Sequence, residues 1–223
     1  MEKSTLMSNE RIKNICDDNC YTGLFYDLIK RILDIVGAMC GIIISIPILL
    51  PISIAIKLES NGPILFSQTR IGKGGKHFKI YKLRSMVVNA EELKEKLSSK
   101  NEMSGPMFKI KDDPRITKVG KFIRKTSIDE LPQLFNVLKG EMSLVGPRPS
   151  LPKEVENFEE WMLKRLIVKP GLTCYWQVMG RNSIDFEDWM KLDLKYVENR
   201  SLLLDIKLIF KTFFVLFGDI NAS

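Results

Sequence analysis

The sequence predicts a monotopic membrane protein, in which a bent hydrophobic helix is followed by one body of helices and strands. Three observations predict it: an apolar run over residues 32–56 that contains Pro47 and Pro51, two β-prone patches with glycines between them over residues 62–86, and a phenylalanine-rich stripe over residues 206–217. The chain has 223 residues, of which 45% are hydrophobic and 27% are charged. This ordinary globular composition excludes a disordered chain, a collagen and a disulfide-rich miniprotein, and it allows one sizeable core.

The charge of the chain favours anionic partners. Lysine and arginine together number 34 against 27 acidic residues, which gives a formal net charge of +7. Nucleic acid, anionic lipid and phosphorylated substrates all satisfy such a charge. Four scattered cysteines and a single histidine argue against a zinc cage and against a catalytic triad built on histidine, and reduced thiols in a cytosol-facing protein are expected.

The apolar run is about 25 residues, or about 37 Å as a straight helix, and this length suits a membrane. Asp34 near its start and the two prolines argue against a simple crossing, because each proline removes a backbone donor and kinks a helix. Lysine and arginine flank both ends of the run, so the positive-inside rule gives no orientation. A re-entrant helix that bends at Pro47 and leaves on the same face satisfies this symmetry. A kinked transmembrane helix is the alternative.

These features divide the chain into a polar lead over residues 1–24, a re-entrant membrane helix over residues 25–58, and a membrane-associated cytoplasmic domain over residues 59–223. Within that domain, residues 62–86 predict a hairpin with a glycine turn, and residues 87–100 predict a charged, solvated helix. The apolar residues of the C-terminal stripe recur at helical spacing. Such a stripe packs in the core or lies at the lipid interface, and partial interfacial contact is the favoured interpretation.

The sequence Ser127-Ile-Asp129-Glu130-Leu-Pro132 holds the strongest candidate for chemistry. Ser-x-x-Glu is also a capping box, so a purely structural role is the first alternative. Pro132 favours a helix start at residue 128 or 129, which would place both carboxylates at the positive end of a helix approached by several basic residues. We expect this environment to lower the pKa of the carboxylates, so that one acts as nucleophile or holds a divalent cation.

Two basic elements could hold phosphate. Arg148 stands between Pro147 and Pro149, and a restrained guanidinium is a natural clamp for two phosphate oxygens. A rigid surface turn with an incidental arginine is the alternative. Lys82 and Arg84 alternate with apolar residues in the predicted hairpin.

With these residues the sequence resembles the bacterial sugar transferases, or monotopic phosphoglycosyl transferases, which load a sugar phosphate onto a polyprenyl phosphate in the membrane. The resemblance runs from about Tyr26 to Phe217. It is carried by four segments: KRILDIVGA leading into the Pro47 run, GPILFSQTRIGKGGKHFKIYKLRSM, GPMFKIKDDPRITKVGKFIRKTSIDELPQLFNVLKGEMSLVGPRP, and VKPGLTCYWQVMGRN. Cys174 stands where many members have glycine, and Leu83 stands where many have phenylalanine.

The resemblance implies an α+β monotopic fold, with the helix break of the re-entrant segment at Pro47 and amphipathic helices at the membrane interface. It implies that Asp129 is the nucleophile on the β-phosphate of a UDP-sugar, that UMP is released, and that polyprenyl (undecaprenyl) phosphate then removes the phosphosugar. Asp129 and Glu130 would help to hold Mg²⁺. The remaining residues implied in substrate binding are Lys82, Arg84, Arg124, Arg148, Gln177 and Arg181.

The resemblance also implies where the protein acts and with what. It implies an inner-membrane protein with its catalytic domain on the cytoplasmic face, where it starts the assembly of an exopolysaccharide, capsule, O-antigen or other surface glycan. The expected partners are the UDP-sugar, the polyprenyl phosphate, anionic lipid, downstream glycosyltransferases and a second copy in a homodimer. A nucleic-acid-binding protein is disfavoured, because no recognised module appears. A membrane scaffold for other enzymes of a glycan pathway remains a third hypothesis.

Overall fold

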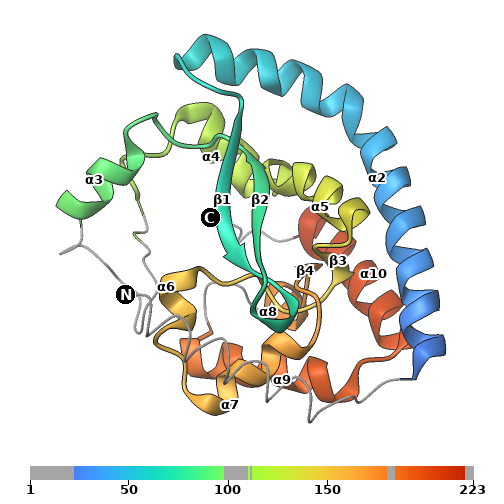
Figure 1. The fold of residues 1–223 in the computed structure, drawn as a ribbon. Coiled ribbons are helices and arrows are strands. Elements are labelled where there is room, and N and C mark those ends of the chain that lie inside the picture. The colour runs from blue at the N-terminus through green and yellow to red at the C-terminus, as the bar shows by residue number, and fades with distance from the viewer. Residues whose placement is uncertain (1–22, 98–109, 111, 180–183, 219–223) are drawn as a thin grey trace.

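The computed structural model describes residues 23–97, 110, 112–179 and 184–218. Most of the predicted polar lead therefore lies outside the described residues. Two small sheets, one antiparallel and one parallel, lie among helices (Figure 1). The elements, in chain order, are α2 (Leu24–Glu59), β1 (Leu65–Ile71), η1 (Lys73–Gly75), β2 (His77–Leu83), α3 (Ala90–Lys96), α4 (Lys118–Lys125), η3 (Ile128–Gln133), α5 (Leu134–Lys139), β3 (Ser143–Val145), α6 (Pro152–Val155), α7 (Glu160–Leu163), η4 (Lys164–Ile167), β4 (Gly171–Thr173), α8 (Tyr175–Met179), α9 (Phe186–Asn199) and α10 (Leu202–Gly218).

The predicted hairpin is confirmed. Strands β1 and β2 pair antiparallel, with Leu65 opposite Leu83 and Ile71 opposite His77. The turn between them contains Gly74 and Gly75, whose φ angles of 66° and 78° suit glycine and few other residues. The second sheet pairs β3 and β4 in parallel, and the chain between those strands forms α6, α7 and η4.

Helix α2 is a single helix of 36 residues that includes both Pro47 and Pro51. Its blue and cyan parts run in different directions (Figure 1), as expected of a helix that contains prolines. It is long and apolar enough to cross a membrane, and little of it is buried inside the protein. A core helix would be mostly buried, so the exposure of α2 is compatible with a membrane-associated helix.

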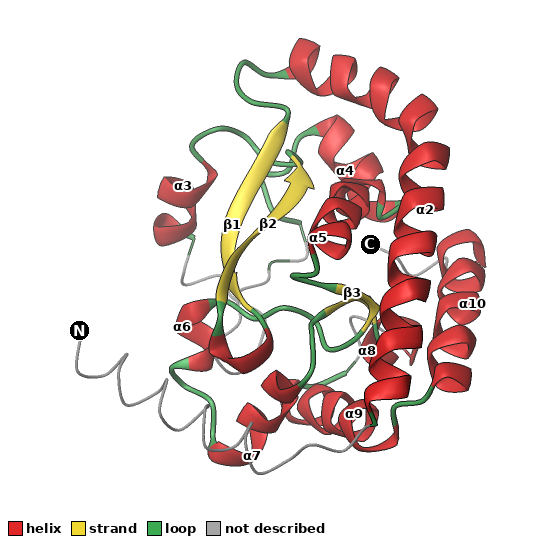
Figure 2. Ribbon diagram, turned by 45° about the vertical axis from the view of Figure 1, so that its right-hand side comes forward, coloured by secondary structure: helices red, strands yellow, loops and turns green. Residues whose placement is uncertain are grey.

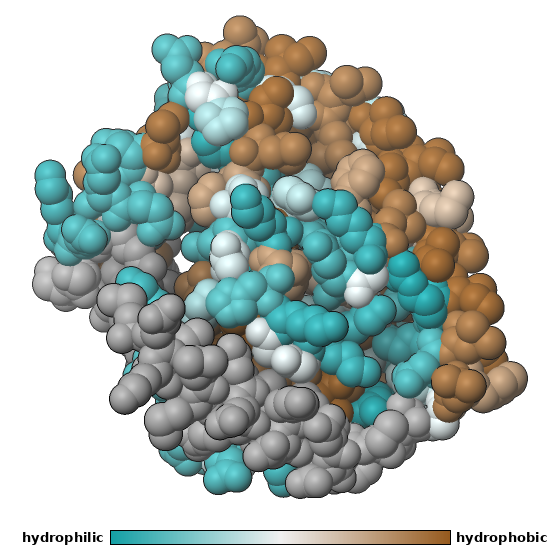
Figure 3. All heavy atoms as spheres, viewed as in Figure 1, coloured by the Kyte–Doolittle hydropathy of each residue, from teal (hydrophilic) through white to brown (hydrophobic). Residues whose placement is uncertain are grey.

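The hydrophobic surface follows α2. Figure 2 shows α10 beside α2 on the same edge of the molecule, and the space-filling view shows a hydrophobic band along that edge beside a hydrophilic area (Figure 3). Ile43, Ile44 and Ile54 of α2 are at least 60% exposed. In α10, the side chains of Phe210 and Phe214 are 61% and 77% exposed. The predicted C-terminal helix is therefore present, and much of its phenylalanine stripe faces outward.

Polar contacts join α2 to the body. The buried carboxylate of Asp34 accepts hydrogen bonds from Ser143 Oγ and Leu144 N, both at 2.9 Å. Arg31 donates to the carbonyl oxygens of Val137 and Leu138 at the end of α5, at 2.6 and 2.7 Å. The charged residue that made a simple membrane crossing unattractive thus has partners inside the protein.

The far end of α2 is joined to the body in the same way. Glu59 accepts hydrogen bonds from the backbone N–H groups of Lys118 and Val119, at 2.6 and 2.9 Å. These are the first two residues of α4, where backbone N–H groups have no partner within the helix. Between these two ends, Ala38 of α2 packs with Leu134 of α5 in one buried apolar cluster. Helix α2 is therefore part of the fold along much of its length.

The predicted charged helix over residues 87–100 is shorter in the structure. Helix α3 covers Ala90–Lys96, and residues 98–109 lie outside the described part of the chain. Glu91 and Glu92 in its first turn are exposed, as predicted for a solvated helix.

Candidate active site

The candidate nucleophile lies in a short 3₁₀ helix. Ser127 precedes it with a left-handed φ of 56°, which no other described non-glycine residue adopts. Its side chain makes no capping hydrogen bond, so the capping-box alternative is wrong. The helix η3 begins at Ile128, within the range that Pro132 favoured. The sharp turn at Ser127 presents Asp129 and Glu130 together.

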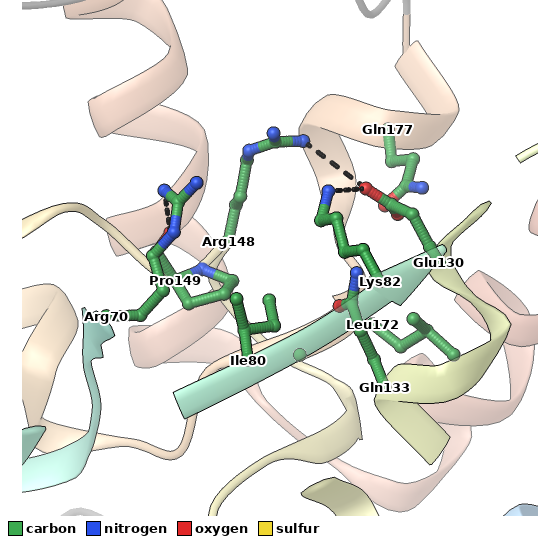
Figure 4. A pocket seen from close by; sticks show the side chains of 10 residues that line it. Arg70, Ile80, Lys82, Glu130, Gln133, Arg148, Pro149, Leu172 and Gln177 are labelled. Atoms are coloured by element: carbon green, nitrogen blue, oxygen red, sulfur yellow. Dashed lines mark hydrogen bonds and ion pairs between the residues drawn. The ribbon is translucent and has the colours of Figure 1, made fainter. Parts of the chain in front are cut away.

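An open cleft lies beside this turn. Figure 4 shows its side chains converging from the hairpin, from η3, from the turn around Arg148 and from α8. Its lining residues are Arg70, Ile80, Lys82, Glu130, Gln133, Arg148, Pro149, Gly171, Leu172 and Gln177. Three cationic side chains and one carboxylate thus face the same space.

Glu130 lies between two of these cations. Its Oε1 atom is 2.6 Å from Lys82 Nζ and 4.0 Å from Arg148 Nη1, and Figure 4 draws both interactions. Only 17% of the Glu130 side chain is exposed, so these attractions are screened less than on an open surface. The structure thus brings Lys82 and Arg148, two residues that the resemblance implies in substrate binding, to Glu130.

Asp129 is buried beside Glu130, with 8% of its surface exposed. Burial, and after it the neighbouring Glu130 carboxylate, raise the pKa of Asp129 from 3.8 to about 6, although Lys82, Arg124 and Arg148 oppose this rise. The expectation of a lowered pKa is therefore wrong for this residue. Desolvation outweighs the nearby cations, and a helix as short as η3 has a weak dipole.

The turn that carries Arg148 is held by its neighbours at four successive carbonyl oxygens. Pro147 O accepts from Gly171 N at 2.9 Å, and Ser150 O accepts from Ile71 N at 2.9 Å. Between them, Arg148 O accepts from Arg165 and Pro149 O accepts from Arg70, at 2.7 and 3.0 Å. These four hydrogen bonds restrain the backbone around Arg148, as the two flanking prolines predict, and the turn lines the cleft.

Glycines allow this turn to lie against β4. A Cβ atom on Gly171 would lie 2.0 Å from the Gly146 nitrogen, and a Cβ atom on Gly146 would lie 2.4 Å from the carbonyl oxygen of Lys169. Backbone atoms cannot move aside as a flexible side chain can. Any larger residue at either position would push the turn away from the cleft.

The other predicted site residues are distributed as follows. Gln177 lines the cleft. Arg124 is exposed at the end of α4 and acts on Asp129 through its charge. Arg84 is buried, and its guanidinium donates to the carbonyl oxygens of Ser60 and Asn61 at 2.7 and 3.0 Å, where α2 ends. Arg181 lies outside the described residues.

Two cleft residues were missed by the sequence prediction. Gln133 lies three residues after Glu130 in η3, and this spacing places two side chains on one face of a 3₁₀ helix. Arg70 pairs with Phe78, and period-2 alternation in the two strands puts it on the same face of the hairpin as Lys82. The register would have revealed Arg70, but it depends on the length of the glycine turn.

Comparison with known proteins identifies the family. A family model described as "Bacterial sugar transferase" matches residues 25–219. The galactosyl transferase CpsE of Streptococcus agalactiae is 51% identical over 184 residues, which are 82% of this chain and 41% of that protein. A UDP-N-acetylgalactosamine-undecaprenyl-phosphate N-acetylgalactosaminephosphotransferase of Aeromonas hydrophila is 43% identical over 193 residues, or 84% of this chain and 43% of the relative.

A third relative has a length closer to that of this chain. The exopolysaccharide production protein ExoY of Sinorhizobium fredii is 38% identical over 187 residues, which are 82% of this chain and 83% of that protein. The chain thus spans about two fifths of the first two relatives and most of the third. The chain belongs to the bacterial sugar transferase family.

Proposed function

We propose that this protein transfers a sugar 1-phosphate from a UDP-sugar to a polyprenyl phosphate, and that undecaprenyl phosphate is the acceptor. The observation that carries the proposal is the cleft itself, in which Glu130 lies among Arg70, Lys82 and Arg148, with the buried Asp129 next to Glu130 in the chain. Three cations match the charge of a diphosphate donor. The names of relatives, which include UDP-sugar and undecaprenyl-phosphate phosphotransferases, support the same chemistry.

The reaction runs in two displacements. An Asp129 carboxylate oxygen attacks the β-phosphorus of the donor, the bond from that phosphorus to the bridging oxygen breaks, and UMP leaves with the electron pair. A phosphate oxygen of the polyprenyl phosphate then attacks the same phosphorus. The bond to Asp129 breaks, which regenerates the carboxylate and yields a polyprenyl diphosphate sugar. Each displacement involves one large substrate at a time, so each has its own in-line geometry.

Magnesium is part of this proposal, and the donor set fits it. Mg²⁺ usually binds one or two carboxylates together with substrate phosphates and waters. Asp129 and Glu130 supply adjacent carboxylates whose mutual repulsion contributes to the raised pKa of Asp129. A bound Mg²⁺ would neutralise charge on the donor phosphates. Lys82, Arg70 and Arg148 bind and orient those phosphates from the other sides of the cleft.

The membrane arrangement is also proposed. Helix α2 enters and leaves on one face, bent near Pro47, and the body rests on the cytoplasmic face of the inner membrane. The curved path of α2 and the hydrophobic edge that it shares with α10 support this (Figures 1 and 3). Surface-glycan assembly, anionic lipid contact, homodimer formation and transfer to downstream glycosyltransferases complete the proposal.

The direct test measures UMP release by the full-length protein in detergent, with Mg²⁺, undecaprenyl phosphate and a panel of UDP-sugars. We expect release with a restricted set of donors and its loss on chelation of Mg²⁺. A second assay uses donor labelled at the β-phosphate and omits the acceptor, so that label accumulates on the protein and is removed when the acceptor is added. Folded protein that releases no UMP with any donor would contradict the proposed function.

The raised pKa of Asp129 predicts the pH dependence of the reaction. The nucleophile must be ionised, and the pKa of Asp129 in the free protein is about 6. We therefore expect kcat/KM for the donor to fall about tenfold for each pH unit below this value and to level off above it. The initial rate of UMP release at low donor concentration, between pH 4.5 and 8.5, checks this. An acid limb near pH 4 would mean that burial does not control the nucleophile.

Arg84 offers a separate test, because its contacts lie at the end of α2. We expect Arg84→Ala to lower the free energy of unfolding by about 1–3 kcal/mol, since it removes a buried guanidinium together with its hydrogen bonds to the carbonyl groups of Ser60 and Asn61. The affinity for UDP should stay within about twofold of wild type, because Arg84 is not among the residues that line the cleft. Thermal unfolding and equilibrium binding measure the two effects. A large loss of UDP affinity would instead support the substrate-binding role that the resemblance implies for Arg84.

A further inference from the structure

A buried ion pair lies behind the turn that carries Arg148. Arg165 of η4 and Asp193 of α9 approach to 2.6 Å between Nη2 and Oδ2, with 2% and 1% of their side chains exposed. A buried ion pair is weak evidence for stability, because the desolvation of both charges offsets their attraction. The contacts that Arg165 makes with residues other than Asp193 therefore indicate the role of the ion pair.

Those contacts are made with the turn. Arg165 Nη2 donates to Arg148 O at 2.7 Å, and Nη1 donates to Ser150 Oγ at 2.6 Å. One planar guanidinium thus joins two residues of the turn to α9 in a fixed geometry, which a lysine could not reproduce with a single nitrogen. Pro147 and Pro149 restrict the local backbone, but the orientation of the turn toward the cleft depends on contacts from outside it.

Two stacked aromatic rings also connect Arg165 with the side chain of Arg148. The guanidinium carbon of Arg148 lies 5.5 Å from the centre of the Trp176 ring. Trp176 stacks on Trp189 with ring centres 4.9 Å apart, and Arg165 lies 5.7 Å from the centre of Trp189. Arg165 therefore contacts the backbone of Arg148 and also Trp189, the second ring of the aromatic stack on which the Arg148 guanidinium lies.

We infer that Arg165, oriented by Asp193, is a positioning residue that holds the Arg148 guanidinium at the cleft for donor phosphate. This inference rests on the proposed function, which makes Arg148 a phosphate ligand. Arg165 is itself too deeply buried to touch the donor. Its effect on donor binding must therefore pass through Arg148 and disappear when the Arg148 guanidinium is absent.

A double-mutant cycle on UDP affinity tests this dependence. The full-length protein in detergent is titrated with UDP well below the unfolding temperature of each variant, so that the dissociation constant reports the folded protein. We expect Arg148→Ala to weaken binding about tenfold or more, as for a lost charge-assisted hydrogen bond. Arg165→Lys should weaken it about threefold to tenfold in the wild-type background, and less than twofold in Arg148→Ala.

A milder variant and a control complete the design. Ser150→Ala removes one acceptor of Arg165 and should weaken binding about twofold to fourfold, again only when Arg148 is present. It carries the test if Arg165→Lys does not fold. The control is Arg115→Lys, because Arg115 forms another buried ion pair, with Asp113 at 2.6 Å, which lines no part of the cleft. This control should lower the unfolding temperature and leave UDP affinity unchanged.

Three outcomes would overturn the inference: no loss of affinity in Arg165→Lys or Ser150→Ala, the same loss in both backgrounds, or an equal loss in Arg115→Lys. UMP release by the wild-type protein separates this failure from failure of the proposed function. If the wild type releases UMP and the cycle is additive, the inference is wrong and the proposed function stands. If the wild type neither releases UMP nor binds UDP, both are wrong.

Discussion

Asp129→Asn is expected to abolish sugar-phosphate transfer while making the protein more stable at neutral pH. Loss of the nucleophile should lower UMP release by about 10³-fold or more. The stability gain follows from the raised pKa, since the folded protein keeps the Asp129 proton up to about pH 6, whereas the unfolded chain releases it near pH 3.8. Above pH 6 the ionised carboxylate therefore opposes folding, and asparagine removes this cost.

The pH dependence of this stability gain tests whether the pKa of Asp129 is raised in the folded protein. Thermal unfolding at pH 7.5 should occur at a higher temperature in Asp129→Asn than in wild type. The difference should shrink as the pH falls from about 6 toward 4, because wild-type Asp129 then becomes neutral as well. The control is Asp188→Asn, which changes an exposed carboxylate on α9 and should leave transfer intact. Normal UMP release by Asp129→Asn would exclude Asp129 as the nucleophile.

Asp205→Ala is expected to cause the largest loss of stability. The carboxylate of Asp205 is buried and accepts from Tyr26 OH and Lys30 Nζ of α2, at 3.1 and 2.8 Å, and from Tyr196 OH of α9 at 2.7 Å. Alanine would remove the acceptor from all three groups and would leave the charge of Lys30 without the Asp205 carboxylate. Breaking a buried ion pair costs about 3–5 kcal/mol. For a chain of this size the unfolding temperature should fall by roughly 10 °C.

Two further variants make the stability experiment specific. Asp205→Asn keeps the size of the side chain and an acceptor for the hydroxyl groups, so its loss should be smaller than that of alanine. Lys191→Ala breaks exposed ion pairs on the surface of α9, where both partners are more than half exposed, and it should change the free energy of unfolding by less than about 1 kcal/mol. If Asp205→Ala unfolds within about 2 °C of wild type, the network does not hold α2 to α9 and α10.

Local patterns in the sequence predicted the elements that depend on near neighbours. The hairpin was predicted because alternating residues and the Gly74-Gly75 turn are all present within residues 62–86. The start of η3 was predicted from Pro132. A substrate-binding role for Lys82 and Arg148 came from a family resemblance, and the spacing along the chain does not reveal that both lie at Glu130.

Features that depend on distant contacts were mispredicted or missed. The pKa of Asp129 depends on burial by the folded chain, and a motif of six residues carries no information on burial. Arg84 shares the alternation of Lys82, but β2 ends at Leu83 and the next residue turns toward α2. Arg165 lies in a helix of four residues, and its role emerges from contacts with two segments distant in the sequence.

The contacts along α2 also decide whether the protein can be made water-soluble by truncation. A simple tether can be cut away and leave a folded domain behind. Deleting α2 would instead remove Ala38 from a buried cluster with Leu134 and Val137, uncap the first turn of α4 and strip Asp34 from β3. A soluble form therefore requires polar substitutions on the outward-facing isoleucines, with the inward stripe of the helix kept intact.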